Sequence, residues 1–118
     1  MDGILLIDKE AGFTSHDVVA VLRGILHQKK IGHAGTLDPD ASGLLPVCLG
    51  KATKCVNLAA DADKCYRAVM RLGIVTDTQD MSGTVLRESL VTVNEEDVRA
   101  AVLGFVGGYD QIPPMYSA

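Results

Sequence analysis

Residues 32–46 read Gly-His-Ala-Gly-Thr-Leu-Asp-Pro-Asp-Ala-Ser-Gly-Leu-Leu-Pro, a run of flexible, acidic and rigid residues. Pro39 biases Asp38 toward an extended conformation. A carboxylate on a stiff loop flanked by glycines is a candidate for chemistry. The same residue types are also typical of an ordinary turn, so both interpretations stay open at this point. Three glycines permit a positive φ or the close approach of another chain: Gly32, Gly35 and Gly43.

The composition is that of one small domain with an aliphatic core. The chain has 118 residues, of which 47% are hydrophobic and only 4% aromatic, with no Trp. The uncharged stretch 100–109 is far shorter than the ~20 apolar residues that span a bilayer. The three cysteines lack the paired spacing of a zinc site, so we expect free thiols in a reducing, cytoplasmic location: Cys48, Cys55 and Cys65.

The net charge of the chain is −4, and the charged residues are unevenly distributed along it. Residues 18–71 carry eight Lys and Arg against four Asp, whereas residues 72–118 carry two basic residues against seven acidic ones. Phosphate binding depends on a local patch rather than on the total charge. The middle of the chain is therefore either a surface for nucleic acid or an ordinary solvated face.

Hydrophobic periodicity predicts strands alternating with helices. We expect strands at residues 3–7, 44–49, 64–72 and 83–90, and a helical segment at 51–60. Thr14 or Ser15 should cap a helix that ends near His27. A capping box from Thr92 to Glu95 should begin a last helix, which ends at residues 107–108. Its buried stripe would be Val98, Ala101, Val102 and Phe105.

Common ligand-binding motifs fail on this sequence. The run from Asp38 resembles the first half of a calcium loop, but Leu49 stands where the bidentate Glu is required. A P-loop needs Lys and Ser or Thr after its glycines, and Gly43 is followed by two leucines. Asp77 and Asp80 are typical of turns and caps. From residue types alone we expect an α/β or α+β domain with a carboxylate-bearing loop.

Several motifs together resemble the TruB-type tRNA pseudouridine synthases, and they run in the same order along the whole chain. The most specific is residues 32–46, with its Leu-Asp-Pro core. The sequence departs from the pattern at Glu10, where the family usually has proline. The other matching segments are Asp8-Lys9, Gly12-Phe-Thr-Ser15, Lys64-Cys-Tyr-Arg67, Leu72-Gly73, Thr76-Asp-Thr78 with Asp80 and Gly83, Gln111-Ile-Pro113 and Met115-Tyr-Ser-Ala118.

The resemblance implies a fold and a domain. The fold is the pseudouridine synthase fold, an α+β (mixed α/β) architecture with a mostly antiparallel mixed sheet flanked by helices, here its N-terminal half only. Residues 1–118 would be the N-terminal part of the catalytic domain. The rest of that domain, with an arginine that pairs with the aspartate, and a C-terminal PUA RNA-binding domain would be absent. The isolated chain should then be inactive and prone to self-association.

The resemblance also implies site residues. Asp38 matches the catalytic aspartate. His33 matches a histidine that occupies space in the T loop when the target uridine flips out, and Tyr66 matches a tyrosine that stacks on the flipped base. Lys9 lies in a motif near the site as a supporting residue without an assigned chemical role.

The implied activity is isomerisation of uridine to pseudouridine at position 55 in the T loop of tRNA. The partner would be the tRNA T stem-loop, with no cofactor, no metal and no membrane, and the full-length enzyme would be a monomer. Two alternatives remain: a dyskerin-type synthase directed by guide RNA, and a non-catalytic RNA-binding or interaction module.

Overall fold

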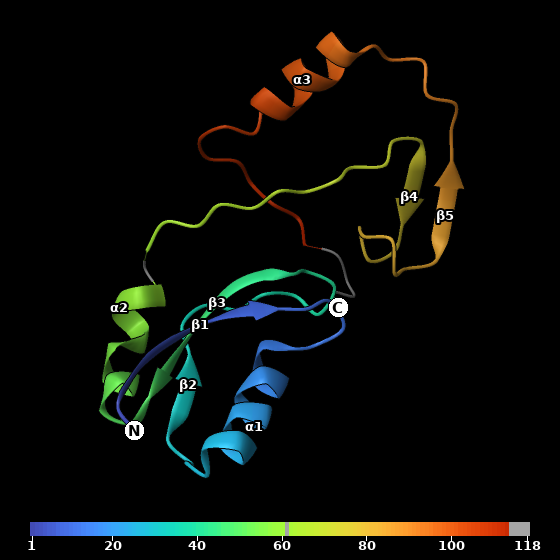
Figure 1. Cartoon of the computed structure of the whole chain (residues 1–118). Helices are drawn as coiled ribbons and strands as arrows, with labels where there is room; N and C mark the ends of the chain where they lie inside the picture. Colours follow the sequence, from blue (N-terminus) through green and yellow to red (C-terminus); the bar gives the residue numbers. More distant parts are fainter. Residues whose placement is uncertain (61, 114–118) are drawn as a thin grey trace. The chain divides into compact units, whose positions relative to one another are not determined.

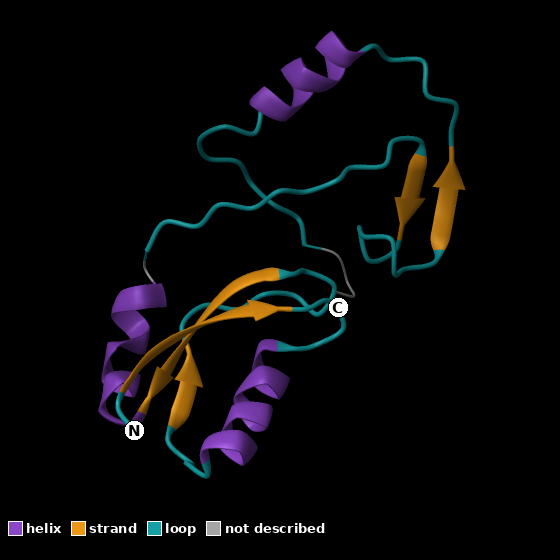
Figure 2. Cartoon of the chain, viewed as in Figure 1, coloured by secondary structure: helices purple, strands orange, loops and turns teal. Residues whose placement is uncertain are grey.

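The computed structural model describes residues 1–60 and 62–113 (Figure 1). The chain divides into two compact parts, the first part at residues 1–66 and the second part at residues 67–118. Helices accompany an antiparallel sheet in each part (Figure 2), so the expected α+β class is confirmed. No helix in the described ranges is long and apolar enough to cross a membrane.

The first part is built on a three-stranded antiparallel sheet in the order β1-β3-β2. Its strands are β1 (Gly3–Lys9), β2 (Ile31–His33) and β3 (Gly43–Leu49). Gly3 pairs with Leu49 and Lys9 with Gly43, so β1 and β3 run the full length of each other. β1 and β3 were predicted. The short β2 was missed, because three residues inside a glycine-rich run carry too weak a pattern.

Helix α1 (Ser15–Leu26) covers one face of this sheet. Thr14 is its N-cap, and Thr14 and Asp17 form a capping box. The Asp17 backbone N–H donates to the Thr14 hydroxyl, and the Asp17 carboxylate accepts from the Thr14 backbone N–H. The hydroxyl of Thr14 also donates to that carboxylate and lowers the pKa of Asp17. The core between helix and sheet is aliphatic, as expected: Val19, Ile31, Leu45, Val47 and Leu49.

Alternation along the strands leaves part of the other face of the sheet exposed. Ile4 and Leu6 are more than half exposed, as is Leu44 on the neighbouring strand. β3 leads into a 3₁₀ helix, η1 (Gly50–Cys55), and then into α2 (Val56–Ala60), so the predicted helical segment is confirmed in two pieces.

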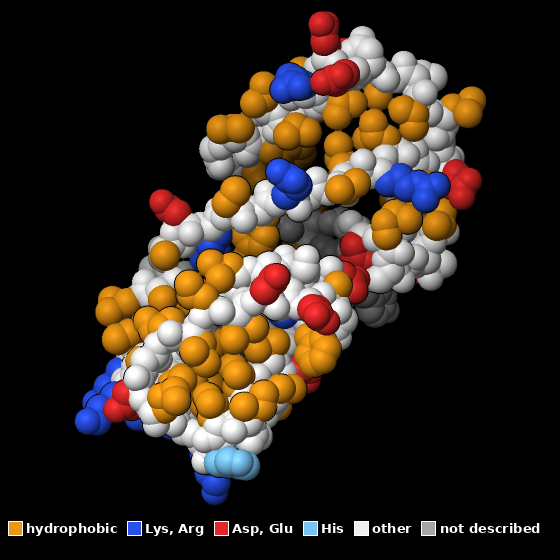
Figure 3. Space-filling model, in the orientation of Figure 1, with side chains coloured by type: hydrophobic (Ala, Val, Ile, Leu, Met, Phe, Trp, Pro, Cys, Tyr) orange, Lys and Arg blue, Asp and Glu red, His pale blue; other side chains and the backbone are white. Residues whose placement is uncertain are grey.

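The second part holds a two-stranded antiparallel sheet, β4 (Ile74–Thr76) with β5 (Val85–Glu88), and the helix α3 (Glu95–Leu103). Within its described residues, Thr76 alone is buried. The predicted stripe of α3 is wrong in this respect, because Val98 is only half-buried and Ala101, Val102 and Phe105 are exposed. Figure 3 shows apolar side chains on the surface of both parts.

The strand predicted at residues 64–72 is absent, although the alternation of apolar and polar residues is clear. Residues 63–72 are exposed and have no regular secondary structure apart from a turn that begins at Leu72. A strand requires a neighbour for its backbone hydrogen bonds, and no described segment pairs with this one.

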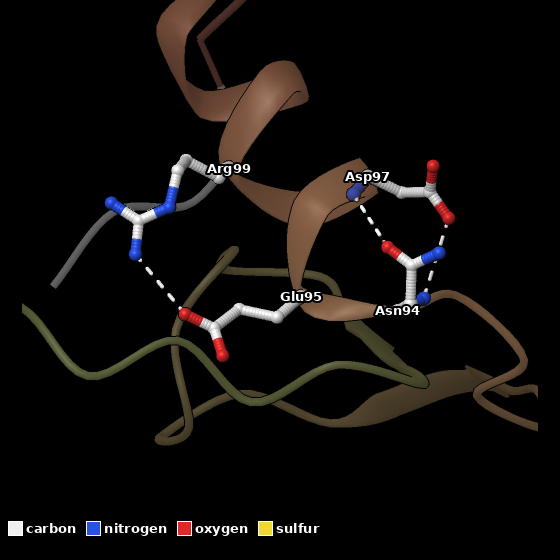
Figure 4. Close-up of polar contacts among 4 residues, drawn as sticks. All are labelled: Asn94, Glu95, Asp97 and Arg99. Carbon is white, nitrogen blue, oxygen red and sulfur yellow. Dashed lines mark hydrogen bonds and ion pairs between the residues drawn. The ribbon is translucent and has the colours of Figure 1, made fainter.

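The start of α3 was predicted two residues too early. Asn94, not Thr92, is the N-cap, and its side chain and Asp97 form the reciprocal bonds of the box (Figure 4). Both sequences fit the capping pattern, but Asn is the stronger N-cap of the two. An exposed Glu95–Arg99 ion pair follows one turn on. The helix ends before Gly104 rather than at residues 107–108.

Adjacent leucines on β3 test this assignment of the core. Leu45 is 1% exposed and Leu44 is 63% exposed. We expect Leu45→Ala to lower the free energy of unfolding of the 118-residue chain by about 2–5 kcal/mol, because it leaves a cavity in the core. Leu44→Ala should cost about 0.5 kcal/mol or less. Urea unfolding measures both, and equal losses would contradict the described orientation of β3.

Candidate active site

The loop that carries Asp38 is held to the segment that follows β1. The carbonyl of Pro39 accepts two hydrogen bonds, one from the backbone N–H of Gly12 at 2.8 Å and one from Lys9 Nζ at 3.2 Å. These groups are about thirty positions apart in sequence, so the bonds fix a long-range contact rather than a local turn. The residue that follows Asp38 is therefore immobilised by two donors.

The residue that precedes Asp38 is held as well. The hydroxyl of Ser15 accepts from the backbone N–H of Leu37 at 3.0 Å and donates to the Leu37 carbonyl at 3.2 Å. Ser15 is 3% exposed and is the first residue of α1, so a rigid element positions it. Both chain neighbours of Asp38 are thus tied to residues 9–15. We call the bonds at Leu37 and Pro39 the loop bracket.

Lys9 is a charged residue of the loop bracket, and it is buried. It is 1% exposed, and its ammonium group donates to three backbone carbonyls: Glu10 at 3.0 Å, Phe13 at 2.6 Å and Pro39 at 3.2 Å. An ammonium has three donors, so these bonds satisfy all of them. Lys9 therefore joins the turn after β1 to the Asp38 loop, and its place as a supporting residue of the site stays a prediction.

The Asp38 side chain itself is exposed. Across residues 1–60 and 62–113, no hydrogen bond or ion pair reaches its carboxylate, whereas its own carbonyl accepts from Ala41 N–H at 3.0 Å. Its direction is therefore set by the bracketed backbone rather than by contacts of the carboxylate. An exposed, oriented carboxylate can act on a ligand that approaches from outside.

His33 ends β2 and enters the same loop, partly buried. The next residue, Ala34, is buried, and its N–H donates to the Pro46 carbonyl at 2.8 Å. His33 and Asp38 thus belong to the same stretch of chain at and after the end of β2, and Lys9 contacts this stretch through the Pro39 carbonyl. No hydrogen bond among the described residues joins His33 to Lys9 or Asp38.

Tyr66 is not brought into this system. It is 62% exposed and lies in a segment without regular structure. None of the hydrogen bonds or ring contacts among the described residues involves it. Its assignment as a stacking residue therefore stays a prediction.

A second ordered loop links β4 to β5 in the second part. Hydroxyls of Ser82 and Thr78 donate to the Asp80 carboxylate, and these bonds hold the pKa of Asp80 below its usual value. Asp77 accepts from Thr84 N–H at 2.8 Å. A side chain at Gly83 would collide with Thr78 and Asp77, so this position requires glycine. Both acids act here as turn formers, as expected.

The basic residues of the first part gather elsewhere. Lys29 and Lys30 are exposed in the turn before β2, and the Lys30 carbonyl accepts from Gly50 N–H at the start of η1. η1 itself carries the exposed Lys51 and Lys54. This end of the sheet is opposite the end where β1 meets the loop bracket. Seven residues of β3 separate the two ends by about 20 Å.

Ser15 is the site residue that sequence reasoning misjudged. It was considered as a helix cap, which is the role of Thr14, and as the last residue of a family motif, with no contact to the Asp38 loop expected. The sequence did offer a signal for a second role, because Thr14 and Ser15 both carry hydroxyls and a helix N-cap requires only one. The partner of the second hydroxyl depends on a contact 22 positions away and could not be read from spacing.

Comparison with known proteins identifies the family. The family model described as TruB family pseudouridylate synthase (N terminal domain) matches residues 23–118. The chain belongs to this family, which confirms the resemblance seen in its motifs. The match includes the Asp38 loop, His33 and Tyr66, but it begins after Lys9 and Ser15.

Individual relatives agree with the family assignment. The tRNA pseudouridine synthase B of Alkaliphilus oremlandii is 55% identical over 118 residues, which are 100% of this chain and 40% of the relative. That of Geotalea uraniireducens is 53% identical over 119 residues, covering 100% of this chain and 38% of the relative. The chain thus spans about 40% of the length of the curated relatives it matches.

One solved structure shares the fold over nearly the whole chain. The crystal structure of a Cbf5-Nop10-Gar1 complex matches with a TM-score of 0.62 and 32% identity. The match covers 98% of this chain and 30% of the solved one. The expected pseudouridine synthase architecture is therefore confirmed by structure as well as by sequence.

Removing the Ser15 hydroxyl tests the loop bracket. Ser15→Ala leaves the N–H of Leu37 without its acceptor, so we expect a loss of about 1–3 kcal/mol in the free energy of unfolding. Ser42→Ala removes an exposed hydroxyl from the same loop region and is the matched control, with a change within about 0.5 kcal/mol. Urea unfolding of the 118-residue chain measures both variants. Equal urea midpoints for Ser15→Ala and Ser42→Ala would show that the Ser15–Leu37 hydrogen bonds do not stabilise the fold.

Proposed function

We propose that this chain supplies the catalytic aspartate of an enzyme that isomerises uridine to pseudouridine at position 55 in the T loop of tRNA. Residues 1–118 would form the N-terminal part of its catalytic domain. The observation that carries the proposal is the exposed Asp38 carboxylate on a loop whose two neighbouring residues are both held. Its occurrence in a TruB-family chain, with relatives named tRNA pseudouridine synthase B, supports the choice of reaction.

The reaction requires access to a base inside folded RNA. A base cannot be detached and reattached while it is stacked, so it must be flipped out at a cost of a few kcal/mol. Stacking on the Tyr66 ring would offset about 1–3 kcal/mol of this cost. The exposure of Tyr66 is compatible with that role, because its ring is not committed to the core of the first part.

Asp38 would then act on the flipped nucleoside. Its carboxylate either attacks as a nucleophile or stabilises a cationic sugar while the N-glycosidic bond breaks. The detached uracil rotates and rejoins the sugar through carbon, and the proton displaced from that carbon is balanced by one gained at nitrogen. The atoms of the product are those of the substrate. No oxidation or hydrolysis takes place, so the proposed chemistry requires no cofactor and no metal.

The rest of the site would come from residues outside this chain. In a dry pocket, desolvation disfavours an ionised carboxylate unless a cation or hydrogen-bond donors favour the charged form. The described contacts include neither at Asp38. We therefore assign activity to the longer enzyme, as a cytoplasmic monomer with tRNA as its partner, and expect the 118-residue chain alone to be inactive.

The guide-RNA-directed alternative is supported by the structural match to Cbf5 in a complex with two proteins. The identity is 32% in that match, against 55% with the Alkaliphilus oremlandii tRNA enzyme. The higher identity favours action on tRNA directly. A non-catalytic module is the second alternative, and it predicts that Asp38 can be replaced without effect.

Replacing Asp38 tests the chemistry. We define a hybrid enzyme in which residues 1–118 replace the matching segment of the Alkaliphilus oremlandii relative. Asp38→Asn keeps the shape and removes the charge, so it should abolish pseudouridine formation in tRNA transcript while tRNA binding persists. Asp40→Asn, on the same loop and also exposed, is the control and should remain active. Turnover by purified Asp38→Asn enzyme would refute the assignment.

Tyr66 is tested in the same hybrid enzyme. Tyr66→Leu removes the stacking ring, and the loss of about 1–3 kcal/mol corresponds to a fall in kcat/KM of roughly five- to 150-fold. The melting temperature should change little, because the ring is 62% exposed in the first part. Tyr66→Phe keeps the ring and should keep most of the activity. Parallel losses of activity and melting temperature would make Tyr66 a core residue instead.

A further inference from the structure

The imidazole of His33 is oriented by the backbone of its own loop. Its Nδ1 lies 2.6 Å from the carbonyl oxygen of Gly35. A carbonyl can only accept a hydrogen bond, so Nδ1 carries the proton in this contact. In the neutral ring the other nitrogen, Nε2, is then an acceptor.

Gly35 directs that carbonyl through its backbone conformation. Its φ is +92°, a region that favours glycine. A Cβ at this position would meet nothing closer than Lys64 Cε at 3.8 Å, which is ordinary van der Waals contact. Glycine is therefore required here for the direction of the chain rather than for space. A side chain would strain the conformation that aims the carbonyl at His33.

The second ring nitrogen of His33 is open. No hydrogen bond among residues 1–60 and 62–113 involves Nε2. The same part of the chain contains no buried side-chain nitrogen or oxygen without a partner. Nε2 is consequently not fully buried, although the ring as a whole is partly buried.

We propose that Gly35 is a positioning residue that holds His33 in its Nδ1–H tautomer, so that Nε2 presents a hydrogen-bond acceptor to RNA. The proposal rests on the function proposed above and goes beyond the space-filling role expected for His33. The RNA group bound must be a donor, either a 2′-hydroxyl or an N–H of a base. Phosphate oxygens are excluded because they only accept, which separates this contact from any made by lysines.

The tautomer can be measured without activity. ¹⁵N NMR of the 118-residue chain at alkaline pH distinguishes a protonated from an unprotonated ring nitrogen, and His33→Gln assigns the signals. We expect His33 to carry its proton on Nδ1. Gly35→Ala should move it toward the Nε2–H form. Gly107→Ala is the matched control, because Gly107 has φ +101° and open space around it.

Two NMR outcomes would overturn the proposal. One is an Nε2–H tautomer in the unchanged chain, which needs no variant and so does not depend on whether Gly35→Ala folds. The other is a folded Gly35→Ala chain whose tautomer is unchanged. Neither NMR outcome depends on whether pseudouridine is formed. Turnover by the Asp38→Asn enzyme, by contrast, would contradict the proposed function but not the tautomer of His33.

Binding of a T stem-loop RNA to the hybrid enzyme tests the acceptor. His33→Phe keeps a planar ring without nitrogen, and loss of one hydrogen bond should raise Kd about tenfold. Single 2′-deoxy substitutions in the RNA identify the donor. If the donor is a 2′-hydroxyl, one 2′-deoxy substitution weakens RNA binding to the unchanged enzyme but not to the His33→Phe enzyme. If no 2′-deoxy substitution has this effect, the donor is an N–H of a base. Equal affinity of His33→Phe and the unchanged enzyme would refute the acceptor role.

Discussion

Two groups of hydrogen bonds to the backbone, one on each side of Asp38, hold the loop on which the candidate site depends. Ser15 holds Leu37 from the start of α1, and Lys9 with Gly12 holds Pro39 from the end of β1. Ser15 belongs to a helix and Lys9 to a strand, whereas Gly12 lies in the turn between them, so the loop is tied to the framework of the first part. This arrangement leaves the carboxylate without a hydrogen bond or ion pair among the described residues, while the backbone on each side of it is held. Such an arrangement suits a group that must meet its ligand rather than stabilise its own fold.

The buried Lys9 shows why one segment of the loop bracket cannot be altered without affecting the other. Burial of an ammonium is costly unless every donor is satisfied, and here three carbonyls at three different positions meet that requirement. The carbonyls come from the turn after β1 and from the Asp38 loop, so neither segment can move without leaving a buried charge short of partners. The Gly12 N–H supplements the same contact. Glu10 lies in this turn, and its carbonyl is one of the three acceptors.

Sequence reasoning succeeded where the deciding interactions are local. Helix α1 follows from its capping residues and apolar stripe, and β1 and β3 follow from apolar runs bounded by glycine and polar residues. Asp38 and His33 were predicted as site residues from a specific motif, and these two assignments stay predictions. The strand predicted at residues 64–72 failed because pairing requires a neighbour that periodicity cannot supply. The role of Ser15 and the tautomer of His33 depend on contacts of the folded chain, which composition and spacing do not encode.

The unequal burial of the two parts has a consequence for how the chain acquires its structure. Residues 1–66 enclose an aliphatic core, whereas Thr76 is the one buried residue among the described residues of the second part. Cooperative stability therefore resides at the N-terminal end, which leaves the ribosome first and can fold as a unit. The amides of β1 and β3 should be the last to exchange with solvent deuterium, and those of α3 among the first. The residues of the loop bracket thus belong to the earliest and most persistent structure of the chain.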